Sequence, residues 1–201
     1  MIATPDLWTF EESYFAKGYE HVCGVDEAGA GPLAGRVYAA AVILPRGLRI
    51  PWINDSKKLT EKRRDSLFEE ITAKATAWAV SWADELEVDE LNILNARMLA
   101  MERALLQLAP RAEFALIDGN RSTGITTHHE TVVKGDEKSA FIAAASILAK
   151  VSRDRYMCEM AEVYPQYGFD RHKGYATSLH YERLRLHGPC PIHRKSFLKK
   201  L

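Results

Sequence analysis

Short apolar runs alternate with longer amphipathic segments along most of this chain. The runs with the length and composition of β-strands are 22–26, 36–44, 76–83, 114–118 and 131–136. The segments whose apolar residues recur at helical spacing are 61–74, 88–108, 137–160 and 175–187. Aromatic residues within 1–20 indicate a short leading helix, and 168–173 is expected to be a loop. Interleaved strands and helices predict an α/β fold, which suits one domain over residues 1–201.

Two helices carry further signals. Thr60 is a preferred N-cap residue, so the helix over 61–74 is expected to begin at Glu61. The acidic segment 84–90 is interpreted as a solvated helix start. The apolar residues that share one face of the next helix, with its methionines as core filling, are Leu91, Leu94, Met98, Met101 and Leu105.

Three of the predicted strands end in a carboxylate beside a glycine or a helix start. These acids are Asp26 with Glu27, Asp118, and Asp136. On strands that adjoin in one sheet they would converge, and four close carboxylates repel one another unless cations neutralise them. Oxygen ligands favour Mg²⁺ or Mn²⁺ over zinc, and two ions ~4 Å apart suit phosphoryl displacement. The pattern therefore predicts a divalent-metal site.

The pair Asp26 and Glu27 sets a geometric condition for that site. Neighbouring residues on a regular strand point to opposite faces of the sheet. The two acids can share a site only if the chain leaves strand geometry near Glu27, which Gly29 and Gly31 permit. The alternative is a tight turn whose acids are merely solvated.

The glycine-rich segment 28–35 also matches the dinucleotide-binding pattern G-x-G-x-x-G/A through Gly29, Gly31 and Ala34. That pattern must open a helix, whereas the apolar run 36–44 predicts a strand. Two carboxylates just before the loop would also repel a pyrophosphate. A dinucleotide site is therefore rejected.

Asp154 is a second candidate for the fourth acid. The predicted helix separates it from Asp136 by 18 residues, about 27 Å at ~1.5 Å per residue, so the two cannot touch one metal cluster. Asp154 lies among Lys150, Arg153 and Arg155. It is interpreted as a surface or interhelical salt-bridge partner.

Composition adds two points. Hydrophobic residues at 47% and charged residues at 27% are ordinary globular values. Neither a signal peptide nor a membrane span is expected. Three scattered cysteines suit a reducing cytoplasm. The net charge is zero, yet residues 1–133 carry 14 Lys and Arg against 20 Asp and Glu, while 134–201 carry 13 against 7. An acidic centre beside a basic C-terminal third suits metal ions in one place and a phosphate backbone in another.

The segment from Asp26 to Gly35, Asp-Glu-Ala-Gly-Ala-Gly-Pro-Leu-Ala-Gly, resembles the opening motif of ribonuclease HII, the type 2 ribonuclease H family, which usually reads Asp-Glu-Ala-Gly-Arg-Gly-Pro-Leu-Ala-Gly. The segments 55–59, 172–175 and 193–197 match further motifs of that family in the expected order, so the resemblance covers roughly residues 21–197. It implies a ribonuclease H-like fold, a mixed five-stranded sheet flanked by helices, with a C-terminal helical and basic extension over about 170–201. The family's catalytic and metal-binding acids fall on Asp26, Glu27, Asp118 and Asp136.

The resemblance also nominates substrate contacts. It implies that backbone groups of Gly29 and Gly31 read the ribose 2′-hydroxyl and that Tyr175 stacks on the sugar. Ala30 stands where the family has an arginine, which removes a phosphate contact. The remaining substrate candidates are Ser56, Lys57, Lys138, Ser139, His172 and Lys173. The motif at 193–197 is assigned to structure or backbone contact.

These features favour a monomeric cytoplasmic endonuclease that uses two Mg²⁺ or Mn²⁺ ions. Its expected substrates are RNA–DNA hybrids and single ribonucleotides embedded in duplex DNA, as in ribonucleotide excision repair, with cleavage 5′ of the ribonucleotide leaving 3′-hydroxyl and 5′-phosphate ends. One alternative is another metal-dependent nuclease of the same fold that acts on plain DNA. A second is a hybrid-binding protein with weakened chemistry because of Ala30. The tail shows no clear sliding-clamp peptide.

Overall fold

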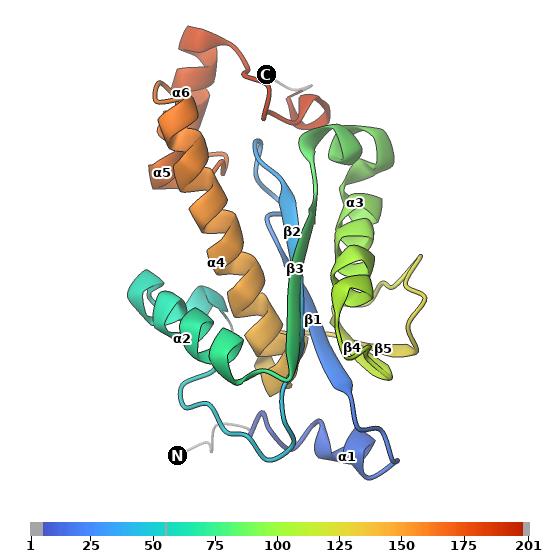
Figure 1. Ribbon diagram of the computed structural model, residues 1–201. Coiled ribbons are helices and arrows are strands. Elements are labelled where there is room, and N and C mark those ends of the chain that lie inside the picture. Colours follow the sequence, from blue (N-terminus) through green and yellow to red (C-terminus); the bar gives the residue numbers. More distant parts are fainter. Residues whose placement is uncertain (1–5, 55, 199–201) are drawn as a thin grey trace.

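The computed structural model describes residues 6–54 and 56–198, and its centre is one mixed sheet (Figure 1). The strands lie in the order β3 (Ala77–Ala83), β2 (Val37–Ile43), β1 (Val22–Ala28), β4 (Phe114–Asp118) and β5 (His129–Val132). β1, β2 and β3 pair antiparallel, whereas β4 and β5 run parallel to β1. This is the mixed five-stranded sheet that the family resemblance implies.

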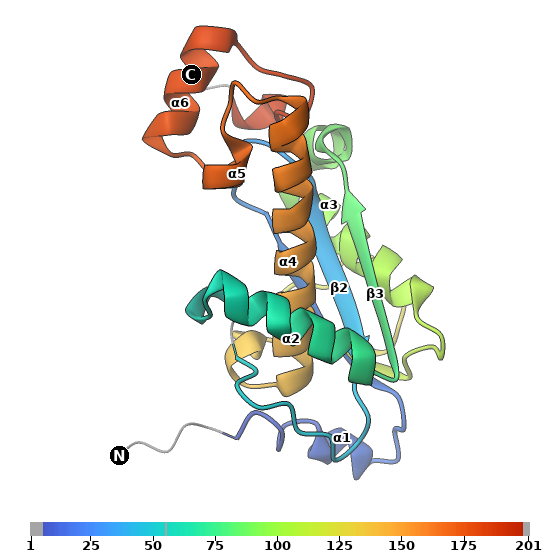
Figure 2. The same ribbon diagram turned by 60° about the vertical axis from the view of Figure 1, so that its left-hand side comes forward.

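Helices cover both faces of the sheet. The helix α3 (Glu85–Gln107) packs on one face, and α4 (Ala140–Val163) with α2 (Glu61–Lys74) packs on the other (Figures 1 and 2). The short helix α1 (Glu12–Phe15) lies at one end of the sheet, and the C-terminal helices α5 (Phe169–His172) and α6 (Ser178–His187) lie at the other. None of the helices in the described ranges is both long and apolar enough to cross a bilayer.

Small residues let α4 lie directly against β1. An ideal Cβ placed on Gly24 would lie 2.1 Å from the carbonyl carbon of Phe141, so only glycine fits at this position of the strand. The alanines of α4 at 140, 143, 144 and 145 are all fully buried and belong to the same core cluster as β1 residue Val22. This close approach brings the polar residue Ser146 of α4 beside the carboxylate of Asp26 in β1.

Several predicted boundaries are confirmed. The helix α2 spans Glu61–Lys74, and the Thr60 hydroxyl accepts a hydrogen bond from the backbone N–H of Arg63 as its N-cap. The strands β2, β3 and β4 fall within one residue of the apolar runs 36–44, 76–83 and 114–118.

The prediction for α3 is wrong in two respects. The helix begins at Glu85, because Asp84 and Glu87 form a capping box at its start. Asn92 then breaks the helical geometry with a φ of 63°. Leu91 and Leu94 flank that break and are 39% and 41% exposed, so they do not belong to the predicted core face, whereas the methionines of the second half are buried.

The predicted short leading helix is confirmed as one turn, Glu12–Phe15, and residues 1–5 lie outside the described ranges. Three other segments differ from the predictions. The segment 168–173 contains α5 instead of being only a loop, and the last helix starts at Ser178 because Thr177 caps it. The run 131–136 is not one strand: β5 ends at Val132, and Lys134 adopts a left-handed conformation that leads into the 3-10 turn Gly135–Glu137.

Candidate active site

Asp26 and Asp118 lie side by side on neighbouring strands. β1 and β4 run parallel with Val25 opposite Ile117, which places the next residues of the two strands, Asp26 and Asp118, in the same row. β4 ends at Asp118, while β1 continues to Ala28. The two acids therefore meet at the point where β1 loses its neighbour on that side.

The chain leaves strand geometry just after Glu27 and not at it: β1 ends at Ala28, and Gly29 follows with a φ of 93°. Glu27 is paired in register with Ala39, and β1 continues beyond it. Alternation therefore holds: the Glu27 carboxylate forms an ion pair with Arg97 of α3 at 2.9 Å, whereas Asp26 is hydrogen-bonded by Ser146 of α4 on the opposite face. The two carboxylates still act on each other: the charge of Glu27 raises the pKa of Asp26. Both lie at the end of β4, beyond which β1 has no neighbouring strand on that side.

Asp136 reaches the same place from the 3-10 turn. The backbone N–H of Gly135 donates a hydrogen bond to Oδ1 of Asp118 at 2.6 Å, which ties this turn to the end of β4. The ammonium group of Lys57 lies 3.8 Å from Oδ2 of Asp136, and its charge also lowers the pKa of Glu27. The charges of Asp26, Glu27 and Asp118 therefore act on one another. Asp136 is connected to them through Gly135, which hydrogen-bonds Asp118, and through Lys57.

The electrostatics of these acids are those of crowded anions. Burial, followed by the charges of Glu27 and Asp118, raises the pKa of Asp26 well above its usual range. Burial also raises the pKa of Glu27, although the Arg97 guanidinium opposes this. The second carboxylate oxygen of Glu27, Oε2, is buried and has no hydrogen-bond partner among the residues that the structure describes. An added cation would relieve both the repulsion and the unsatisfied oxygen.

The donor set therefore fits a divalent metal. Its members are carboxylate oxygens, which hard ions prefer. Within residues 6–54 and 56–198, however, no three His, Cys, Asp or Glu side chains already lie close enough to hold one ion. Each of two carboxylates is held by a protein partner, Asp26 by Ser146 and Glu27 by Arg97.

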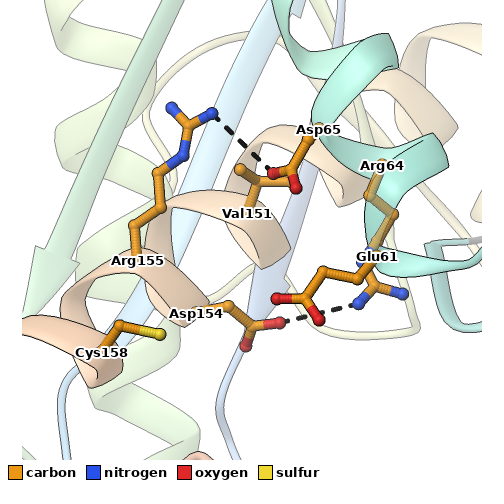
Figure 3. Close-up of a pocket in the computed structure, with 7 residues that line it drawn as sticks. All are labelled: Glu61, Arg64, Asp65, Val151, Asp154, Arg155 and Cys158. Carbon is orange, nitrogen blue, oxygen red and sulfur yellow. Dashed lines mark ion pairs between the residues drawn. The ribbon is translucent and has the colours of Figure 1, made fainter. Parts of the chain in front are cut away.

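Asp154 lies outside this cluster. The helix α4 runs without a break from Ala140, so Asp154 lies ~21 Å along it from its first residue. Its carboxylate forms ion pairs with Lys150 at 2.7 Å and Arg64 at 3.8 Å. Figure 3 shows it in the wall of a pocket of about 330 Å³ that lies between α2 and α4. The interpretation of Asp154 as an interhelical salt-bridge partner is confirmed.

Two residues that contact the acids were missed by the sequence analysis. Arg97 pairs with Glu27, and Ser146 hydrogen-bonds Asp26. Arg97 carries no sequence signal, because an arginine on an amphipathic helix is normally solvated. Ser146 does carry one, since it is a polar residue inside a run of α4 that is buried on every side.

The predicted substrate contacts Ser56, Lys57 and Lys138 differ in their exposure. Ser56 is buried, and its hydroxyl oxygen lies 2.9 Å from that of Ser146, so it supports the site from within. The exposed Lys57 faces the acids. The exposed Lys138 donates to the carbonyl oxygen of Val133 at 2.7 Å.

Ser139 has a structural part. It is fully buried, its hydroxyl donates to the Glu11 carboxylate, and it also caps α4 by accepting from the backbone N–H of Ile142. These bonds occupy the hydroxyl, and burial removes it from the surface. The position therefore favours a helix cap over the predicted phosphate contact.

The His172–Tyr175 segment lies beside the glycine-rich loop. The backbone N–H of Leu33 donates to the carbonyl oxygen of Gly174 at 2.9 Å, which joins the two segments. His172 is buried and fixes the turn through Tyr167 and Gly174, whereas the ring of Tyr175 is 42% exposed. Lys173 donates to the carbonyl oxygen of Asp170 at 2.6 Å. Of the four residues, Tyr175 is therefore the one whose side chain faces solvent most.

Three histidines brace this segment from behind. His172 stacks on His180 with ring centroids 4.3 Å apart. Nδ1 of His180 donates to the carbonyl oxygen of Tyr175 at 3.0 Å, and Nε2 of His180 accepts from Nε2 of His193 at 3.0 Å. Nδ1 of His193 accepts from the backbone N–H of Cys190 at 2.9 Å. This hydrogen-bond chain requires neutral rings.

The chain of histidines predicts a loss of stability in mild acid. Burial lowers the pKa of both His180 and His193 to about 4, from about 6.5 in an unfolded chain. The unfolded chain therefore binds protons at higher pH. Their contribution to the free energy of unfolding is complete above pH ~6.5 and is lost as the pH falls toward ~4.

Urea unfolding between pH 7.5 and 4.5 measures this loss. The buried acids Asp26 and Glu27 have raised pKa values, so they stabilise the folded protein as the pH falls, which is the opposite of the histidine effect. The His193→Gln variant keeps these acids, so comparing it with the unaltered protein isolates the contribution of His193. We expect a smaller acid-induced loss in the variant than in the unaltered protein. Equal pH dependence in the two proteins would show that His193 contributes nothing to it.

Comparisons with known proteins agree with this site and fold. A family model described as ribonuclease HII matches residues 23–200. The ribonuclease HII of Endomicrobium trichonymphae is 53% identical over 193 residues, which cover 96% of this chain and 92% of that protein. The ribonuclease HII of Dechloromonas aromatica is 57% identical over 176 residues, covering 88% and 90%.

Solved structures share the architecture. The ribonuclease HII of Archaeoglobus fulgidus, solved in a complex with PCNA, has a TM-score of 0.77 at 28% identity, over 90% of this chain and 96% of that chain. A Bst ribonuclease HIII solved with Mn²⁺ has a TM-score of 0.66 at 19% identity, over 84% and 63%, which shows the fold alone. The sheet and its helices thus have the ribonuclease H-like fold. The chain belongs to the ribonuclease HII family.

Proposed function

We propose that this metal-dependent endoribonuclease, whose family acts on RNA–DNA hybrids, also cleaves duplex DNA on the 5′ side of single embedded ribonucleotides, leaving 3′-hydroxyl and 5′-phosphate ends. The observation that carries the proposal is the cluster of Asp26, Glu27, Asp118 and Asp136, in which one buried Glu27 oxygen has no hydrogen-bond partner within residues 6–54 and 56–198. A cluster of this kind suits hydrolysis of a phosphodiester.

The four acids are proposed to bind two divalent ions, Mg²⁺ or Mn²⁺. When bound, such ions activate water and stabilise the leaving oxygen of an in-line displacement. The contribution of the chain is to hold the carboxylates in place: Ser146 fixes Asp26, and Arg97 fixes Glu27. The ammonium group of Lys57 lies beside Asp136, where it can contact a phosphate of the substrate next to the acids.

Recognition of the ribose is proposed for the glycine-rich loop and Tyr175. The backbone N–H groups of Ala30 and Gly31 donate no hydrogen bond to any residue that the structure describes, so they are available to an incoming acceptor. The exposed Tyr175 ring lies close by, through the Leu33–Gly174 hydrogen bond. Aromatic stacking and 2′-hydroxyl contacts together distinguish RNA from DNA.

The expected partners follow from this proposal. They are RNA–DNA hybrids and duplex DNA that contains ribonucleotides, met by a cytoplasmic monomer. The PCNA complex of the A. fulgidus relative raises the question of a clamp contact, for which this sequence offers no clear peptide. Residues 199–201, at the end of the tail, lie outside the described ranges.

Cleavage of end-labelled duplexes tests the proposed function. Duplexes carrying zero, one or several ribonucleotides are incubated with the protein, with and without Mg²⁺ or Mn²⁺. We expect metal-dependent cuts 5′ of the ribonucleotide and none in all-DNA duplex. Cutting of the all-DNA duplex would support a plain-DNA nuclease, and hybrid binding without cutting would support a binding protein.

A pair of variants tests Tyr175. Its ring centroid lies 5.5 Å from the guanidinium of Arg153 and 5.8 Å from the ammonium of Lys150, so it is already oriented. Tyr175→Phe keeps the ring and is expected to retain most activity. Tyr175→Ala is expected to lose ~1–3 kcal/mol of stacking, about ten- to a hundredfold in kcat/KM on single-ribonucleotide duplexes. Normal cleavage by the alanine variant would reduce Tyr175 to a packing residue.

The variant Ala30→Arg, which has the arginine usual in the family at this position, is expected to be more active. Neither cation nearest in sequence substitutes for this arginine in this proposal: the Arg36 guanidinium lies between the rings of Trp82 and Tyr156, and Lys57 already has its own proposed phosphate contact beside Asp136. Ala30→Arg adds a charge-assisted phosphate contact, which is typically worth ~1.5–3 kcal/mol. We therefore expect kcat/KM to rise about tenfold or more.

Steady-state kinetics at two salt concentrations check this prediction. Another neutralised phosphate should also steepen the salt dependence of binding. Ala30→Gln is a control that adds length without charge and should leave the salt dependence unchanged. Equal rates and equal salt slopes for the unaltered protein and Ala30→Arg would contradict the prediction that an arginine at position 30 adds a phosphate contact.

A further inference from the structure

Two buried arginines hold the glycine-rich loop from beneath. Arg194 is fully buried, and all its side-chain nitrogens donate to loop carbonyl oxygens. Nε and Nη2 bind the carbonyl of Gly35 at 2.8 and 2.6 Å, Nη2 binds Gly29 at 2.7 Å, and Nη1 binds Ala30 at 3.1 Å and Pro32 at 2.9 Å. One guanidinium group thus collects four carbonyl groups of a seven-residue loop.

Arg153, also fully buried, ties this loop to the His172–Tyr175 segment. It donates to the carbonyl oxygens of Ala34 at 3.3 Å and of Lys173 at 2.9 Å, one in each segment. An ideal Cβ on Gly29 would lie 2.0 Å from its Nε, so only glycine fits above this guanidinium. The ring of Tyr175 also lies over it.

Burying these two guanidinium groups costs free energy of folding, so stability alone does not account for the arrangement. Both positive charges are removed from water, and they hydrogen-bond to carbonyl oxygens instead of pairing with carboxylates. Nη1 of Arg153 is buried, and no residue in the described part of the chain hydrogen-bonds it. Burial and the charge of Arg153 lower the pKa of Arg194 to about 9. Buried charge held in this way suggests a function beyond packing.

The arginines also fix which backbone groups face outward. The carbonyl groups of Gly29, Ala30 and Pro32 are turned inward to Arg194, while the N–H groups of Ala30 and Gly31 bind no described residue. A loop held by its carbonyls presents its N–H groups on the other side, where they can meet an oxygen acceptor.

We propose that Arg194 and Arg153 are positioning residues for ribose specificity. Arg194 sets the direction of the Ala30 and Gly31 N–H groups, and Arg153 sets the distance between that loop and Tyr175. Being fully buried, neither side chain touches the substrate itself. The inference rests on the proposed function, which assigns this loop and Tyr175 to the ribose.

Binding measurements on Arg194→Lys and Arg153→Lys test this proposal. Lysine keeps the charge but cannot bridge several carbonyl groups at once. Dissociation constants are measured in Ca²⁺ for a duplex with one ribonucleotide and for the same all-DNA duplex. We expect each variant to keep its affinity for the all-DNA duplex and to lose about tenfold of its preference for the ribonucleotide. Arg155→Lys, an exposed arginine of the same helix, should leave the preference unchanged.

A purely structural role would give a different result: lower melting temperatures with an unchanged ribonucleotide preference, which would overturn the proposal. If the unaltered protein itself binds both duplexes equally, the proposed function fails and not merely the part given to the arginines. The two failures are therefore distinguishable.

A second measurement keeps the proposal testable if the lysine variants do not fold. The unaltered protein is labelled with ¹⁵N-alanine and ¹⁵N-glycine, and its amide resonances are followed during titration with each duplex. We expect the Ala30 and Gly31 N–H signals to shift in a ribose-dependent way. Identical shifts with the all-DNA duplex would contradict the proposal.

Discussion

Asp26→Asn and Asp118→Asn are each expected to lower cleavage of an RNA–DNA hybrid by about a thousandfold or more, because a lost metal ligand removes several kcal/mol of transition-state stabilisation. The two residues are neighbours across β1 and β4, and asparagine preserves their shape. Asp26→Asn should also raise the melting temperature of the metal-free protein. Its carboxyl has a raised pKa, so its ionised form is disfavoured in the folded state at neutral pH.

The matched control is Asp154→Asn. This carboxylate is also buried and also forms ion pairs, with Lys150 and Arg64, but it lies between α2 and α4. Hybrid cleavage by this variant is expected to stay within about twofold of the unaltered protein, since Asp154 is not one of the four proposed metal ligands, all of which the variant keeps. Loss of activity in Asp154→Asn, with activity retained in Asp136→Asn, would reverse the assignment of the fourth acid.

Gly24→Ala is expected to give the largest loss of stability. The added Cβ would lie 2.1 Å from the carbonyl carbon and 2.3 Å from the carbonyl oxygen of Phe141, which are backbone atoms and cannot rotate away. Either β1 or α4 must shift, at a cost of about 3 kcal/mol or more in the free energy of unfolding. Because Asp26 and Ser146 meet across this contact, metal-dependent activity should fall as well.

Gly31→Ala is the control for stability. An ideal Cβ on Gly31 meets no atom within 4 Å, and its φ is not in the left-handed region. Chemical denaturation should therefore give a free energy of unfolding within about 0.5 kcal/mol of the unaltered protein. Equal stability of Gly24→Ala and Gly31→Ala would contradict the close packing of β1 on α4.

The sheet and the four acids were accessible from the sequence because they depend on local pattern. Apolar runs with the period of a strand located β2, β3 and β4, and acids at the ends of such runs indicated where they meet. The Thr60 cap placed the start of α2 for the same reason, since capping is decided within a single turn.

The features that were missed depend on tertiary contacts or on single dihedral angles. The break of α3 at Asn92 rests on one residue with positive φ, which helical spacing does not reveal. Glu27 stays within β1, where its carboxylate pairs with Arg97, while the neighbouring strand β4 stops at Asp118. The contacts of Arg97 with Glu27 and of Arg194 with the loop join residues 70 and more than 150 positions apart. No local pattern reports them.

The central claim is that Asp26, Glu27, Asp118 and Asp136 hold the catalytic ions. Anomalous diffraction from crystals of Asp118→Asn, grown with Mn²⁺ and a single-ribonucleotide duplex, would be ambiguous because the variant lacks a ligand. The direct measurement uses the unaltered protein with Mn²⁺ and a duplex whose scissile phosphate carries a non-cleavable sulfur substitution. Two anomalous peaks ~4 Å apart among these four carboxylates are expected. Peaks elsewhere, for instance beside Asp154, with none among the four acids, would contradict the claim.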